Sequence, residues 1–157
     1  MVEIKAPNNY KQTHMKYSIF LGGTIDMGNS FNWQKQFKEH LEKQSQFEDY
    51  WMILNPRRDD WDSSWIQHID NPQFNEQVTW ESEALEDADL RVFVFLPDSK
   101  SPITLMELGA SKDKPNVVYC PFEYYRSGNV YIFCKRHNIP MYTDWENFLQ
   151  SFKIKQK

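Results

Sequence analysis

The chain has 157 residues, a length typical of one domain with a sizeable hydrophobic core, so we expect one domain rather than several. Hydrophobic residues make up 40% and aromatic residues 16%, a composition that excludes a largely disordered protein. Lys and Arg number 18 against 22 Asp and Glu, which gives a formal net charge of −4. This acidic balance argues against a general duplex-binding protein, whose affinity would come from a basic face.

No apolar stretch approaches the roughly 20 residues that a membrane-spanning helix needs, and the mean hydropathy is −0.74. Residues 1–16 are polar and lack the apolar core of a signal peptide. Both observations predict a soluble, cytoplasmic protein with no membrane partner. Cys120 and Cys134 fit no metal spacing and follow apolar neighbours, which is typical of buried structural thiols.

Residues 1–15 show no periodicity, so we expect a flexible N-terminal arm before a single domain over residues 16–157. Five short apolar runs predict strands, at 17–23, 50–55, 90–97, 116–121 and 139–142. Five helical patterns alternate with them, over 31–46, from about 74, from 102, over 128–137 and over 144–152. Residues typical of helix starts precede three of these patterns: Asn29 and Ser30, Ser101 with Pro102, and Asp144.

Alternating strands and helices predict βαβ units and a doubly wound parallel sheet. In such sheets the ligand lies beyond the carboxyl ends of the strands. Polar or small residues follow the first four predicted strands in turn, and we take these as candidate binding residues: Gly22, Gly23, Thr24 and Asp26, then Arg57 and Arg58, then Ser101, Thr104 and Glu107, then Arg126, Gly128 and Asn129.

The Gly22–Gly23 pair suits either a close approach of ligand to backbone or a tight strand exit. The segment lacks the G-x-G-x-x-G spacing and the chain has no G-x-x-x-x-G-K, so neither NAD nor ATP binding is predicted. The sequence also has no G-x-S-x-G elbow and no zinc-ligand spacing. We therefore expect neither a metal nor a cofactor.

Glu107 lies among apolar neighbours in the second turn of its predicted helix, where an unpaired carboxylate is unfavourable. It is therefore either paired structurally or used in chemistry. Glu81 has a similar setting in the preceding helix, although a solvated helix face explains it equally well. Two carboxylates in one cleft suit glycosidic chemistry, in which one is the nucleophile and the other binds, orients or protonates the leaving group.

Arg57 and Arg58 suit bidentate binding of a phosphate or carboxylate, and equally suit ion pairs with the nearby aspartates. Several aromatic residues could stack on a base, although most are expected in the core or an interface: Trp33, Trp61, Trp65, Trp80 and Phe122. Of these, Trp80 directly precedes Glu81 and is our candidate for the site.

Five segments together resemble one family. They are LGGTID, ILNPRRDDWD, QVTWESEALEDADLRVFVFLP, SPITLMELG and YYRSGNVYIFC, in this order within residues 16–143. Their order and spacing are similar to those of the nucleoside 2-deoxyribosyltransferase-like family. The resemblance implies a flavodoxin-like, three-layer αβα fold with a five-stranded parallel sheet, and cleavage of the N-glycosidic bond of a nucleoside or nucleotide.

The resemblance also implies roles for individual residues. Glu107 matches the family's nucleophile, which attacks the anomeric carbon, and Glu81 matches the acidic residue that contacts the base and helps protonate it. Asp89 matches a position that we expect to be structural. Asn129 matches a position that often reaches into a neighbouring subunit's site, which implies a homodimer or a larger homo-oligomer.

Two positions depart from the family pattern. Phe20 stands where many relatives have a Tyr that hydrogen-bonds the nucleophile, so another group must orient Glu107. Ser101 stands where deoxynucleoside transferases often have an Asp that holds the 5′-hydroxyl. A Ser at a helix N-terminus favours a phosphate, with Arg57 or Arg126 as possible partners, although Ser101 as a plain helix cap explains the residue equally well.

These observations predict cleavage of a nucleoside 5′-monophosphate or nucleoside, by hydrolysis or base exchange, through a covalent ribosyl-Glu intermediate. The alternative is a catalytically silent nucleotide-binding or sensing module of the same fold. A subunit that acts on a base within nucleic acid is disfavoured by the acidic balance. The expected partners are thus a small nucleoside or nucleotide and further copies of the chain.

Overall fold

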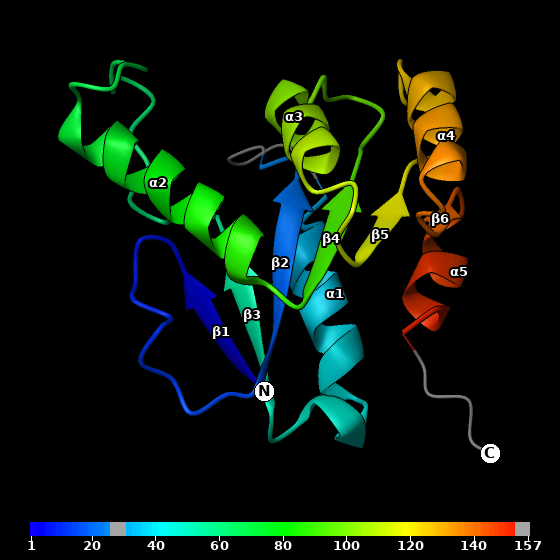
Figure 1. The fold of residues 1–157 in the computed structure, drawn as a ribbon, viewed down its shortest axis with the longest axis horizontal. Helices are drawn as coiled ribbons and strands as arrows, with labels where there is room; N and C mark the ends of the chain where they lie inside the picture. Colours follow the sequence, from blue (N-terminus) through cyan, green and yellow to red (C-terminus); the bar gives the residue numbers. More distant parts are fainter. Residues whose placement is uncertain (26–30, 153–157) are drawn as a thin grey trace.

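The computed structural model describes residues 1–25 and 31–152. Six parallel strands form a single sheet in the order β1-β3-β2-β4-β5-β6, and helices flank the sheet (Figure 1). The strands are β1 (Val2–Lys5), β2 (Tyr17–Gly23), β3 (Trp51–Asn55), β4 (Leu90–Val94), β5 (Asn116–Tyr119) and β6 (Met141–Tyr142). The five strands from β2 onward follow the order 2-1-3-4-5 that is found in flavodoxin-like sheets.

The number of strands differs from the five that the sequence predicts. Val2–Lys5, in the segment expected to be a flexible arm, forms β1 and pairs in parallel with β3, with Ile4 opposite Leu54. Ile4, Ala6 and Tyr10 are buried against the rest of the molecule. The four-residue strand was missed because two of its residues are charged, so its apolar signal is short and weak.

The helices lie on both faces of the sheet, as expected for a doubly wound fold. They are α1 (Trp33–Glu42), α2 (Pro72–Asp87), α3 (Pro102–Ala110), α4 (Ser127–Arg136) and α5 (Trp145–Gln150), with a short 3₁₀ helix, η1 (Ser45–Phe47). Side chains of α2, α3 and α4 form one core cluster with Phe20, Phe93 and Val118 of the sheet. Side chains of α1 and α5 form the other with Ile19, Ile53 and Val92.

This division follows from the alternation of side chains along buried strands. Ile19 and Leu21 of β2 point to the α1–α5 face, whereas Phe20 between them points to the α2–α4 face. Val92 and Phe93 of β4 alternate in the same way, and all of these side chains are fully buried. Continuous apolar runs of this kind are typical of parallel strands covered on both sides.

The helix starts agree in part with the sequence. Asp144 caps α5 by accepting a hydrogen bond from the Asn147 N–H, as predicted. The N-cap of α1 is Asn32, and the predicted cap at Asn29 and Ser30 lies outside the described residues. Ser101 occupies the N-cap of α3 and Pro102 follows it, but the Ser101 side chain makes no capping hydrogen bond.

The strand order changes direction next to β2. The chain runs from β2 outward to β3 on one side and then returns to place β4 on the other side. In open α/β sheets the crevice at such a switch point, beyond the carboxyl ends of the strands, is where ligands bind. The fold therefore directs attention to the segments that follow β2 and β4, and to α2 and α3 beside them.

Candidate active site

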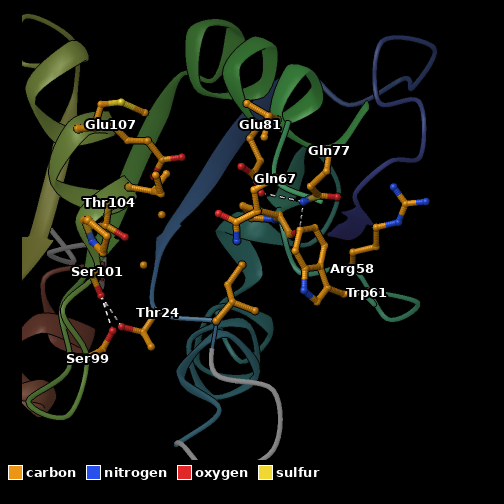
Figure 2. Close-up of a pocket in the computed structure, with 18 of the residues that line it drawn as sticks. Thr24, Arg58, Trp61, Gln67, Gln77, Glu81, Ser99, Ser101, Thr104 and Glu107 are labelled. Carbon is orange, nitrogen blue, oxygen red and sulfur yellow. Dashed lines mark hydrogen bonds between the residues drawn. The ribbon is translucent and has the colours of Figure 1, made fainter. Parts of the chain in front are cut away.

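A pocket of about 500 Å³ opens at this switch point. Figure 2 shows it between two walls. One wall comes from the end of β2, the segment after β4 and α3, with Thr24, Ser99, Ser101, Thr104 and Glu107. The other comes from α2 and the long loop before it, with Arg58, Trp61, Gln67, Gln77 and Glu81. Both predicted carboxylates thus line the same pocket.

Glu107 lies in the second turn of α3, and its carboxylate accepts no hydrogen bond from the described residues. Burial, and after it the charge of Glu81, raises the pKa of Glu107 to about 8. Phe20, at the position of the tyrosine expected in relatives, is fully buried in the core. A half-buried carboxylate with a second acid nearby is a typical candidate for a functional group.

Glu81 faces the pocket from the third turn of α2. Its Oε1 accepts a hydrogen bond of 2.7 Å from Gln77 Nε2. Burial raises the pKa of Glu81, and the hydrogen bond from Gln77 opposes that rise because it favours the charged form. The two carboxylates therefore differ in their surroundings, since of the residues that the structure describes only Gln77 donates a hydrogen bond to either carboxylate, and it does so to Glu81.

Gly22 forms the floor beside Glu107. An ideal Cβ at this position would lie 2.5 Å from a ring carbon of Phe93 and 3.4 Å from Glu107 Oε2. Gly23 has a φ of +151° and its Cβ would lie 2.6 Å from the Val94 carbonyl. These contacts with protein atoms explain the glycine pair as a tight exit from β2, and a close approach of ligand to this backbone stays a prediction.

Three hydroxyl groups meet at the N-terminus of α3. Ser101 Oγ lies 2.7 Å from Thr24 Oγ1 and 2.8 Å from Ser99 Oγ, both within hydrogen-bond distance. Ser101 has a φ of 46° and a ψ of 51°, a left-handed conformation that is unfavourable for a non-glycine residue. The Ser101 side chain therefore does not cap α3, and its hydroxyl lies with those of Thr24 and Ser99 in the pocket wall.

Arg58, from the loop after β3, also lines the pocket and is held by several partners. Its Nε lies 2.7 Å from Asp60 and its Nη1 lies 2.9 Å from Glu76. The guanidinium also lies over the ring of Trp65, which makes an edge contact with Trp61 in the pocket wall. The ion pairs that the sequence left open for the arginines therefore form at Arg58.

Several predicted site residues lie elsewhere. Arg57 lines a separate hollow with Lys5 and Asp59, and Trp80 is buried against Tyr10, where its Nε1 donates to the Asn8 carbonyl. The residues predicted at the start of α4 are exposed and do not line the pocket: Arg126, Gly128 and Asn129. Asp26 lies outside the described residues. Thr104 and the Gly22–Gly23 pair do line the pocket.

Sequence reasoning missed three polar residues of the pocket: Gln67, Gln77 and Ser99. Gln77 precedes Glu81 by one helical turn, so helical spacing alone places the two on one face. Ser99 precedes Ser101 by two residues in the same loop. Gln67 had no sequence signal, because its place depends on the path of a loop.

Asp89 behaves as a structural residue, as the resemblance implies. Its carboxylate accepts hydrogen bonds from Ser18 N–H at 2.8 Å and Ser18 Oγ at 3.0 Å, which join the start of β4 to β2. Cys120 and Cys134 are buried and unbridged, and burial raises their pKa values to about 12 and about 11. Neither thiol is therefore a ready nucleophile.

The described residues contain no cluster of three or more His, Cys, Asp or Glu side chains that could hold a metal ion. Within residues 1–25 and 31–152, no helix has the length and apolar character needed to cross a bilayer.

The protein is thus an α/β protein with a pocket at the switch point of a parallel sheet. The particular family follows from a direct comparison, because the model named "Nucleoside 2-deoxyribosyltransferase like" matches residues 16–125. The chain belongs to this family. A search of curated proteins found no match.

Proposed function

We propose that the protein cleaves the N-glycosidic bond of a nucleoside 5′-monophosphate or nucleoside, with Glu107 as nucleophile and Glu81 as the acid that serves the base. The observation that carries this proposal is the presence of both carboxylates in one pocket, on α3 and α2. Family membership supports nucleoside chemistry. A paired nucleophile and acid is the arrangement that glycosidic cleavage requires.

In the proposed reaction, a carboxylate oxygen of Glu107 forms a bond to the anomeric carbon while the bond from that carbon to the base nitrogen breaks. The base takes the proton of Glu81 as it leaves. Water then attacks the anomeric carbon and gives a proton to Glu81, which releases the sugar and restores the Glu107 carboxylate. If a second base attacks in place of water, the result is base exchange.

A 5′-phosphate is favoured by the hydroxyl groups of Ser101, Thr24 and Ser99. They lie at the N-terminus of α3, where free backbone N–H groups and the helix dipole favour an anion. An aspartate at position 101 would repel a phosphate, whereas a serine donates to it. Arg57 and Arg126 lie outside the pocket, so the hydroxyl groups are the main support for this part of the proposal.

A homodimer is also proposed, in which the segment around Asn129 reaches a neighbouring subunit. Arg126, Gly128 and Asn129 are exposed at the start of α4, beside the exposed aromatic side chains of Phe122 and Tyr125. Sedimentation velocity on the wild type and on Asn129→Ala tests this arrangement. A monomer at micromolar concentration would contradict it.

The predicted cytoplasmic location is retained in this proposal, because nucleotides are available to a protein in that compartment.

A catalytically silent nucleotide-binding module is the second candidate. It is favoured by the Glu107 carboxylate, which receives no hydrogen bond from the described residues and has Phe20 in place of the expected tyrosine. Such a module would bind a nucleotide, with heat measurable by calorimetry, and would release no base.

The two candidates are separated by a chromatographic assay for free base. The protein is incubated with each nucleoside and 5′-monophosphate, in ribo and deoxy forms, with and without an acceptor base. Release of base by the wild type, together with its loss in Glu107→Gln, supports cleavage. Mass spectrometry of the denatured protein then detects the added sugar on the peptide that contains Glu107. Binding without release from every substrate would favour the binding module.

A further inference from the structure

We propose that Gln77 is a positioning residue that holds Glu81 in the orientation needed to serve the leaving base. This inference rests on the proposed function. It concerns a residue that contacts Glu81 and acts through it, one helical turn away on α2. Three features support this role of Gln77: the hydrogen bonds of its amide group, its burial, and the oxygen atoms of Gln77 and Glu81 that have no hydrogen-bond partner among the described residues.

Both hydrogens of the Gln77 amide nitrogen are engaged. Nε2 donates to the Pro56 carbonyl at 2.7 Å and to Glu81 Oε1 at 2.7 Å. Pro56 directly follows β3, so the amide connects the carboxyl end of a strand to the helix that carries Glu81. Figure 2 shows this bond from Gln77 to Glu81 in the pocket wall.

The orientation of the amide is fixed by its surroundings. If the group were turned over, Gln77 Oε1 would face the Pro56 carbonyl and Glu81 Oε1, so three acceptors would meet without a hydrogen. In the observed orientation Gln77 is 4% exposed, and its Oε1 is buried with no hydrogen-bond partner among the described residues. A buried acceptor without a partner is rare and unfavourable, and it indicates that the bonds made by Nε2 matter more.

The two oxygens of Glu81 are consequently different. Oε1 is held by Gln77, while Oε2 receives no hydrogen bond from the described residues and is available to a ligand. When Glu81 gives its proton to a departing base, the negative charge that it gains is stabilised by the N–H of Gln77. A bond that strengthens as charge develops assists the reaction itself rather than ground-state binding.

Two other charged residues line the pocket near this pair. Glu107 faces it from α3, and each added negative charge there opposes ionisation of Glu81. Arg58 lies in the loop wall, where Asp60 and Glu76 neutralise it. Gln77 is therefore the hydrogen-bond donor that the described residues supply directly to Glu81.

A direct test measures the titration of Glu81 by carbon-13 NMR of its carboxyl group, in a Glu107→Gln background that removes the second acid. Gln77→Met keeps the shape of the side chain and removes the donor, so the Glu81 midpoint should move to higher pH. Gln77→Glu, which places an acid beside Glu81, should also raise the Glu81 midpoint. It replaces the Met variant if that variant fails to fold. Gln73→Met, on the exposed first turn of the same helix, is the matched control and should leave the midpoint unchanged.

A kinetic test uses the otherwise wild-type enzyme and two kinds of leaving group. Gln77→Met should lower kcat for a natural nucleotide about tenfold or more, with a smaller change in KM, because general acid catalysis contributes about 10²–10⁴ to such rates. For the same sugar carrying 4-nitrophenolate, which leaves without a proton, the loss should be much smaller. The alkaline limb of the pH profile should also move upward with the natural base.

The outcomes distinguish the role of Gln77 from the proposed cleavage of the N-glycosidic bond. An unchanged Glu81 midpoint in Gln77→Met and Gln77→Glu, or an equal loss of kcat for both leaving groups, overturns the role of Gln77 while leaving the glycosidase proposal intact. Absence of base release by the wild type overturns the proposed function, and the positioning role with it. Shifted titration together with a loss confined to the natural base supports both.

Discussion

Glu107 and Glu81 face one pocket from two helices, and the charge of each affects the ionisation of the other. Such coupling makes the pH dependence of the reaction a test of the site. The reaction needs Glu107 ionised while Glu81 keeps its proton, so kcat/KM should fall as the pH rises through about 8, where the pair loses its second proton.

Glu81→Gln removes one of the two causes that raise the pKa of Glu107. We expect Glu107 to ionise at lower pH in this variant, because the negative charge that opposes its ionisation is gone, and the fall of kcat/KM near pH 8 to disappear. The maximal rate should fall about 10²-fold or more, because the acid is lost. A pH–rate profile of both proteins measures this, and a fall of kcat/KM near pH 8 that persists in the variant would contradict the assignment.

The hydroxyl of Ser101 should distinguish phosphorylated from unphosphorylated substrates. Ser101→Ala should weaken the binding of a 5′-monophosphate about 10- to 150-fold, because a hydrogen bond to a charged group contributes about 1.5–3 kcal/mol, and should leave the binding of a nucleoside nearly unaffected. KM values for matched pairs of substrates give the comparison. Ser82→Ala, on the exposed side of α2, is the control. Equal losses for both substrates would refute a phosphate contact.

Gly22 tests the packing beneath the nucleophile. Gly22→Ala places a methyl group against the buried ring of Phe93 and beside Glu107, so we expect a loss of about 1–3 kcal/mol in the free energy of unfolding, together with reduced turnover. Gly109→Ala on α3 is the matched control, because no atom lies within 4 Å of its added Cβ. Urea denaturation of the two variants would show equal stabilities if the packing argument were wrong.

At the level of the elements, the N-terminal segment supports the helix that carries Glu81. Tyr10 Oη donates to Asp87 at 2.8 Å, and the Tyr10 ring packs edge-on against Trp80 at 5.7 Å between centroids. Trp80 in turn donates to the Asn8 carbonyl at 2.8 Å. Residues 1–14 lie outside the stretch matched by the family model, yet they contact α2 directly on both sides of Glu81.

Removing the Tyr10 ring should therefore affect stability and site together. Tyr10→Ala should lower the free energy of unfolding by about 3 kcal/mol, in the range for loss of a buried aromatic side chain, and should reduce turnover because α2 loses a contact. Tyr50→Ala, at a side chain that is 60% exposed, should change stability by less than about 0.5 kcal/mol. Thermal unfolding and the base-release assay measure both effects; a stable Tyr10→Ala would show that the segment is not a support.

The elements that the sequence predicted are those with strong local signals. Apolar runs such as VFV in β4 indicate the buried strands, and Ser101-Pro102 indicates the start of α3. The strand β1 was missed because its burial depends on pairing with β3, which is distant in the sequence. The same distinction applies to the site, since the glutamates lie in patterned helices whereas Gln67 and Arg58 are placed by a loop that has no periodicity.

Arg57 shows the limit of this reasoning at neighbouring positions. Arg57 and Arg58 follow the same strand and have the same side chain, yet only Arg58 lines the pocket. Successive side chains in extended chain point in opposite directions, so the choice between them depends on the local path after Pro56. Residue type and position in the sequence therefore identify both arginines as candidates, but they do not decide which of the two lines the pocket.

For the whole molecule, the buried acid on α3 opposes folding at high pH. A carboxyl whose pKa is raised by folding binds more protons in the native state than in the unfolded state between its two pKa values. The stabilisation is therefore present below the ordinary value of 4.5 and is lost as the pH rises toward about 8.

Glu107→Gln should remove this dependence. Its free energy of unfolding should exceed that of the wild type at pH 8, and the difference should shrink toward pH 5, because the wild-type carboxyl is neutral there. Urea titrations at several pH values measure the slope. Parallel curves for the two proteins would show that Glu107 has an ordinary ionisation in the native state.

The pairing of β1 has a consequence for how the chain assembles. The strand β1 pairs with β3 and not with β2, which follows it in the sequence. It therefore has no native partner until residues 51–55 have been synthesised, and β3 pairs with β2 on its other side. The strand β1 thus lies at the border of the sheet, where it covers backbone groups of β3 that would otherwise be free to pair with other chains.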